Sequence, residues 1–201
     1  FGYLIGVLLS LITACLIVRS YKNYLKPQFD KQLFLQILKD GFPMLLFGIL
    51  GFIFFSTDQI MLGKMRGVTE VGYYSLITKG VLLINLIPSL IMVALFPHLS
   101  ANVNDKEKIK KLTKKVLLSF IGLGLLISIL VFFLAPIIPF FVGQSYEPSV
   151  GLTQFLIWII IFMFPSTYFT YLYLSYNKQM INFYLTAICA IINLVLNFIL
   201  I

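Results

Sequence analysis

Long stretches without a charged residue divide the chain into apolar segments. A membrane hydrocarbon core about 30 Å thick requires about 20 apolar residues of helix. Some windows are shorter than this, and we expect the helices of two of them to continue past a charged residue, Asp58 in one and Lys79 in the other. We predict an all-α, polytopic membrane protein with six transmembrane helices. The six uncharged windows are 1–18, 41–57, 80–97, 116–146, 148–177 and 179–201.

Composition excludes several classes of protein. Of the 201 residues 60% are hydrophobic and 11% are charged, against about 25% charged in ordinary soluble domains. The net charge of +8 does not indicate nucleic-acid binding, because the basic residues lie in short connections between apolar segments. Cys15 and Cys189 lie within apolar segments far apart in sequence, so we expect small core residues rather than a disulfide or a metal site.

The basic residues predict the orientation of the helices. When the helices are traced alternately across the membrane, the connections 19–40, 99–115 and 175–180 fall on one side, with twelve of the 15 basic residues. The opposite side holds only Lys64 and Arg66. Since positive charge is retained in the cytoplasm, we predict that the first side is cytoplasmic. The twelve are Arg19, Lys22, Lys26, Lys31, Lys39, Lys106, Lys108, Lys110, Lys111, Lys114, Lys115 and Lys178.

Two cytoplasmic connections have helical patterns. Asn104, followed three residues later by Glu107, has the form of a capping box at a helix start. In 29–40, apolar residues recur at helical spacing beside Asp30 and Lys31. This stretch is either an amphipathic helix on the inner leaflet or the first turns of the second span.

Asp58 and Lys79 are the two charged residues within predicted spans. Charges in hydrocarbon are costly unless they face protein or water, so each indicates a functional site. The second and third spans form a hairpin that turns near Gly67, which places both residues at similar depth and within pairing distance. The alternatives are an ion pair without function, or a lysine that reaches outward to the surface. The functional interpretation is a transport cavity in the outer half of the membrane, to which Gln59 and Asn85 also contribute.

Other polar and helix-breaking residues fit a transporter better than an enzyme. Asn193 and Asn197 lie one turn apart, and we expect interhelical hydrogen bonding rather than ligand binding. No histidine cluster, phosphate-binding loop or catalytic triad is present in the sequence, and we predict no catalytic residue, metal or cofactor. Prolines at positions that kink or hinge membrane helices are Pro43, Pro88, Pro136, Pro139 and Pro165.

Several short motifs follow one another along the chain. They are Gly41-Phe-Pro43, Thr57-Asp58-Gln59-Ile60-Met61-Leu62-Gly63, Val71-Gly72-Tyr73-Tyr74 with Lys79, Leu95-Phe96-Pro97-His98-Leu99-Ser100, Gly143-Gln144-Ser145-Tyr146 and Asn193 to Ile201. In order and spacing this set resembles bacterial polysaccharide-exporting flippases of the multidrug, oligosaccharidyl-lipid and polysaccharide exporter superfamily. The resemblance covers nearly the whole chain and implies that 41–63 and 71–100 are the seventh and eighth helices of that family.

The resemblance implies a two-bundle exporter of which this chain is a part. Residues 1–18 would be the last helix of the first bundle, 19–40 a cytoplasmic linker and 41–201 five helices of the second bundle. The implied activity is flipping of a polyprenyl-diphosphate-linked oligosaccharide across the bacterial cytoplasmic membrane for surface polysaccharide such as O-antigen. The implied partners are that lipid-linked substrate, membrane lipid and the remaining half of the transporter. Such proteins line their cavity with cations, and this chain supplies only Lys79.

Two other functions remain open. The first is a cation-coupled multidrug exporter of the same superfamily, in which Asp58 would take Na⁺ or H⁺. The second is a membrane scaffold that transports nothing. A cavity rich in basic residues favours a diphosphate substrate, one rich in acidic residues favours cationic drugs, and a bundle core without water favours the scaffold.

Overall fold

The computed structural model describes residues 2–20 and 29–200, without the side chains of 2–4, 18–20, 40 and 200. Every regular element in these ranges is helical, so the all-α prediction is confirmed. Five segments are long and apolar enough to cross a membrane. The first predicted span is the exception, since its apolar helical stretch Ile5–Ile17 is shorter. By contact density the chain forms two compact units, Phe1–Gly41 and Phe42–Ile201.

The first unit contains α1, Gly2–Ser20, and the beginning of α2, Lys31–Met65. Asp30 caps α2, because its Oδ1 accepts hydrogen bonds from the backbone N–H groups of Gln32 and Leu33 at 2.8 and 3.2 Å. The helical pattern predicted in 29–40 is therefore confirmed, and this stretch opens α2. The linker predicted at 19–40 includes residues 21–28, which lie outside the described residues. The division into 1–18, 19–40 and 41–201 stays a prediction.

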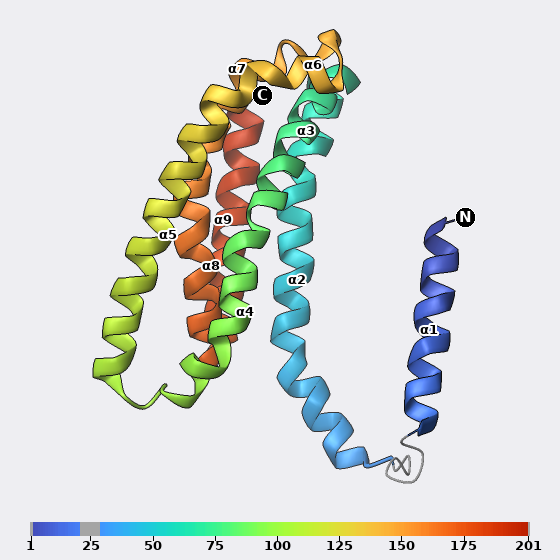
Figure 1. Ribbon diagram of the computed structural model, residues 1–201, viewed down its shortest axis with the longest axis vertical. Helices are drawn as coiled ribbons and strands as arrows, with labels where there is room; N and C mark the ends of the chain where they lie inside the picture. Colours follow the sequence, from blue (N-terminus) through green and yellow to red (C-terminus); the bar gives the residue numbers. More distant parts are fainter. Residues whose placement is uncertain (1, 21–28, 201) are drawn as a thin grey trace. The chain divides into compact units, whose positions relative to one another are not determined.

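The second unit is a bundle of long helices that alternate in direction (Figure 1). α2 turns into α3 at Gly67, whose φ of 99° favours glycine. The hairpin predicted there is confirmed. The remaining elements are α3 (Val68–Ile84), α4 (Leu86–Ala101), α5 (Lys106–Leu134), η1 (Ala135–Ile137), α6 (Ile138–Val142), η2 (Gln144–Tyr146), α7 (Ser149–Leu156), η3 (Ile157–Ile159), α8 (Ile160–Ser175) and α9 (Gln179–Leu200).

The third span is broken at Asn85, between α3 and α4. Pro88 has no N–H to donate to the carbonyl of Ile84, and its ring crowds that carbonyl. The next bond, from the Ser89 N–H to the Asn85 carbonyl, is long at 3.4 Å. The helix consequently breaks three residues before the proline, and the kink expected at Pro88 is confirmed. Pro136 and Pro139 lie where α5 gives way to η1 and α6.

The buried core lies among α4, α5 and α8. Phe120, Phe164 and Tyr168 are almost completely buried. Gly124 of α5 allows the closest approach to α8, because a Cβ there would lie 3.2 Å from the Cα of Ile161. One turn further, the Ser128 hydroxyl donates to the Ile157 carbonyl at 3.1 Å. Small residues and hydroxyls at a contact are typical of membrane helix packing, in which close backbone approach replaces hydrophobic burial.

The connections alternate between the two ends of the bundle as predicted (Figure 1). The turns at Gly67 and Gly143 share one end, called the outer end below because the charge pattern predicts that it faces outside. The connections at 102–105 and 176–178 share the other end. The helix start predicted near Asn104 is one residue later, since Asp105 accepts the N–H of Lys108 at 3.0 Å. Asp105 also forms an ion pair with the Lys108 ammonium at 3.2 Å, and these bonds lower the pKa of its carboxyl.

Candidate functional site

Three helices of the second unit meet at the half-buried carboxylate of Asp58. Its Oδ2 accepts a hydrogen bond from the hydroxyl of Tyr74 on α3 at 2.7 Å, and its Oδ1 accepts one from the amide of Asn197 on α9 at 2.5 Å. The same amide donates to the Oδ1 of Asn193, one turn earlier, at 3.3 Å. Both oxygens of a carboxylate on α2 are therefore held by uncharged donors from two neighbouring helices.

Of the alternatives for Asp58 and Lys79, the ion pair is not formed in the described part of the chain. Tyr74 occupies the place expected for the lysine. Lys79 follows Tyr74 by five residues, which is about 140° around a helix of 3.6 residues per turn, and its side chain is exposed. The depth of the two charges was compatible with pairing, but their directions around the helices were not.

The hydrogen bond between Asn197 and Asp58 confirms the interhelical role expected for this asparagine. Tyr74 was not predicted as part of the site, although the sequence contained a signal for it. Tyr74 is seven residues after the Gly67 turn and Asp58 is nine before it, so the two lie within about 3 Å of the same depth. A buried tyrosine hydroxyl requires a partner, and the carboxylate provides it.

Asn85, another of the predicted site residues, lines a cavity of about 410 Å³ between α2, α8 and α9. The hydroxyl of Thr167 on α8 donates to the Asn85 Oδ1 at 3.4 Å, so the break in the third span is joined to α8. Gln59 is half-buried beside Asp58 and does not line this cavity. The polar residues of the lining are uncharged: Asn85, Ser166, Thr167, Thr170, Tyr173, Asn182 and Thr186.

The wall of this cavity also contains aromatic side chains and Cys189. Cys189 is exposed, as is Cys15 of the first unit, so the prediction that both are small core residues is wrong. Both pack poorly because the described parts of α1 and α9 present most of their side chains on the surface. Within residues 2–20 and 29–200, no group of three or more His, Cys, Asp or Glu side chains could hold a metal ion.

The site thus has three separate parts. The first is the Asp58 cluster, with its carboxylate held by neutral donors; the second is the uncharged polar cavity at Asn85; the third is the exposed ammonium of Lys79. Neutral donors stabilise an ionised carboxylate without cancelling its charge, so the cluster can attract a cation. Lys79 can attract an anion.

A comparison with protein families identifies the chain more closely. The family described as "Polysaccharide biosynthesis protein" matches residues 4–151. Comparisons with curated proteins and with solved structures give no significant match. The matched range includes Asp58, Tyr74, Lys79 and Asn85. With its helices long and apolar enough to cross a membrane, the chain is a multi-pass membrane protein that belongs to this polysaccharide biosynthesis family.

Proposed function

We propose that the chain forms part of a flippase that moves a polyprenyl-diphosphate-linked oligosaccharide across the bacterial cytoplasmic membrane. Membership of a polysaccharide biosynthesis family supports the biological process. The transport step is supported by polar groups inside a bundle of membrane helices. The proposal assigns no bond-making chemistry to the chain, because its polar groups fit binding and translocation.

The observation that carries the proposal is the exposed side chain of Lys79 in a membrane-spanning helix. Lys79 lies two residues from the buried Ile77 and two from the buried Val81, so it projects from the opposite face of α3. The segment Val68–Ala101 has its middle near Asn85, and Lys79 comes six residues earlier, or about 9 Å along the helix. That depth is within the outer half of a hydrocarbon core about 30 Å thick.

An ammonium at that depth requires water or an anionic partner. Leaving it in hydrocarbon costs about 2.5–3.5 kcal/mol even on the mildest insertion scale. A hydrated path that carries a diphosphate satisfies this requirement, because the path hydrates the lysine and the lysine attracts the passing anion. The hydrophobic tail remains in the bilayer, where its transfer costs nothing. The polar lining at Asn85 favours a transporter over a scaffold with a dry core.

Flux measurements with charge variants test this proposal. Lys79→Met should lower the flipping of a lipid-linked oligosaccharide in proteoliposomes, while Lys79→Arg should retain most of it because the charge remains. Lys64→Met is the matched control, since Lys64 is an exposed cation in the last turn of α2. Full flux in a normally expressed Lys79→Met protein would refute the role of Lys79. In cells, loss of the protein should leave lipid-linked oligosaccharide in the cytoplasmic leaflet.

A second candidate function is cation-coupled export, which the Asp58 cluster favours. Its two hydrogen-bond donors are uncharged, so the carboxylate has no counter-charge from them. A Na⁺ ion or a proton could supply it and link an ion gradient to the position of α9. Asp58→Asn then should abolish any dependence of transport on a Na⁺ or pH gradient. A gradient dependence that persists in Asp58→Asn excludes this candidate.

A further inference from the structure

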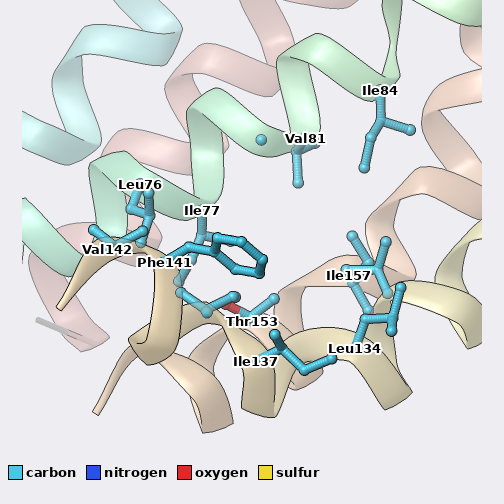
Figure 2. Close-up of a pocket in the computed structure, with 13 residues that line it drawn as sticks. Leu76, Ile77, Val81, Ile84, Leu134, Ile137, Phe141, Val142, Thr153 and Ile157 are labelled. Carbon is cyan, nitrogen blue, oxygen red and sulfur yellow. The ribbon is translucent and has the colours of Figure 1, made fainter. Parts of the chain in front are cut away.

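An apolar cavity of about 400 Å³ lies toward the outer end of the second unit, separate from the site described above. One wall is α3, from Leu76 to Ile84, and the other is formed by the end of α5, η1, α6 and α7. Figure 2 shows Ile77, Val81 and Ile84 projecting from α3 toward the opposite wall, to which Phe141 of α6 contributes.

The lining offers nothing to a polar ligand. Thr153 is its only side chain with an oxygen or nitrogen atom, and the Thr153 hydroxyl is already used, since it donates to the Ser149 carbonyl at 2.7 Å. Apolar cavities of about 150 Å³ stay dry and take up small hydrocarbons. This cavity is more than twice that size, so hydrocarbon fills it far better than water does.

The dimensions match one leaflet of a bilayer. The α3 wall runs over nine residues from Leu76 to Ile84, whose ends are about 12 Å apart along the helix. One leaflet of a hydrocarbon core is about 15 Å deep. The wall ends immediately before the break at Asn85, and its other end is toward the Gly67 turn, so the cavity extends along the outer half of the span.

The outer end of the cavity has the polarity of a headgroup region. Tyr73 precedes Ile77 by one turn on the same face of α3, and its ring packs against Tyr146 of η2 with 5.7 Å between centroids. Tyrosines are enriched where hydrocarbon meets headgroups. Phe140 and Phe141 of α6 are 81% and 78% exposed, which opens this region to surrounding lipid.

We propose that this cavity binds one acyl chain of an outer-leaflet glycerophospholipid, with its headgroup at the Tyr73–Tyr146 pair. An apolar cavity with an aromatic, interfacial end is complementary to an amphiphile. The cavity is not complementary to a helix from another chain, because the polar ends of such a helix would find no partner in the lining. A chain of one leaflet's length fits the wall, whereas a polyprenyl tail would extend beyond it. The bound chain supports α3 directly above the break at Asn85.

Crosslinking with a photoreactive lipid tests the proposal. The intact protein is reconstituted with phosphatidylglycerol that carries a diazirine on one acyl chain, and the crosslinked peptides are identified by mass spectrometry. Crosslinks should concentrate on 76–84 and 131–142. Gly80→Leu should fill the cavity, because a Cβ at Gly80 meets no atom within 4 Å. This variant should lower crosslinking at these peptides by at least about tenfold, the loss expected when roughly two methylenes of chain are displaced.

Gly122→Leu is the matched control, since Gly122 of α5 also has no atom within 4 Å of its Cβ position and does not line the cavity. Its crosslinking pattern should equal that of the unmodified protein. Phe141→Ala, which widens the entrance, gives a second test if Gly80→Leu does not fold, and it should shift the crosslinks among the same peptides.

Three results would overturn the proposal. Crosslinks spread evenly over all exposed helix faces would show ordinary lipid contact only. Displacement of the probe by polyprenyl phosphate, but not by excess unlabelled phosphatidylglycerol, would assign the cavity to an isoprenoid tail. Crosslinked protein dimers joined through 76–84, in place of lipid adducts, would assign it to a second copy.

Discussion

Gly124 allows the backbones of α5 and α8 to lie close together, and its replacement by alanine tests how much stability depends on that close approach. A Cβ at this position would lie 3.2 Å from the Cα of Ile161 and 3.4 Å from the carbonyl oxygen of Ile160. Both are backbone atoms, so no side chain can rotate away and the two helices must separate by a few tenths of an ångström. Overpacking of this kind costs about 1–3 kcal/mol.

A second glycine of α5 corrects for the change in helix propensity. Glycine to alanine gains about 0.5–1 kcal/mol in a helix interior, and Gly122→Ala should show this gain alone because its Cβ position is empty. For a chain of this length 1 kcal/mol corresponds to about 2–4 °C in Tm. We therefore expect Gly124→Ala to melt roughly 2–12 °C below Gly122→Ala.

The assay is thermal unfolding of the purified variants in one detergent, followed by loss of the monodisperse peak in size-exclusion chromatography. The difference between the two variants is the quantity of interest, because detergent effects are common to both. Equal melting temperatures, or a higher value for Gly124→Ala, would refute the close approach of α5 to α8.

The remaining predictions concern local contacts. Tyr74→Phe should cost about 1.5–3 kcal/mol, the value of a hydrogen bond to a charged group, and the loss should largely disappear in an Asp58→Asn background; an equal loss in both backgrounds would contradict the bond. Gly67→Ala should cost about 1–3 kcal/mol, because the φ of 99° and ψ of 172° at the turn lie in a region adopted almost exclusively by glycine, and an unchanged Tm would argue against that conformation. The pKa of Asp105 is lowered mainly by the hydrogen bond from the N–H of Lys108. The contribution of the Asp105 carboxylate to stability should therefore be complete at neutral pH and decline as pH falls through the lowered pKa. An Asp105→Asn protein with the same pH profile of stability would exclude this contribution.

The positions of the helices were largely predictable from the sequence, because membrane spans require long apolar segments. The hairpin at Gly67 and the break near Pro88 were also predictable, because glycine accepts a positive φ and proline has no N–H to donate within a helix. The helix cap near 104 was predicted one residue early, since Asn104 and Asp105 can both accept a backbone N–H. Only the backbone conformation at that turn, where Asp105 is extended, distinguishes them.

The partners of Asp58 were less predictable, for a geometric reason. Depth along a helix can be counted from a turn, but the direction of a side chain depends on how each helix is rotated against its neighbours. Apolar residues predominate on these spans, so their few polar residues do not fix that rotation. Asn197 is 139 residues away in sequence, and nothing in the local pattern shows that α9 packs beside α2.

The unequal packing of the bundle divides it into a stiff part and a compliant part. α5 and α8 are locked by the backbone contact at Gly124, and closely packed regions resist deformation. The described residues of α2 include none that is buried, and α2 meets α9 through the side-chain bonds of Asp58. Side-chain hydrogen bonds can change length and direction as helices shift, whereas a close backbone contact cannot slide without steric overlap. Mechanical work done on this bundle should therefore appear as displacement of α2 and α9 against a fixed block of α4, α5 and α8.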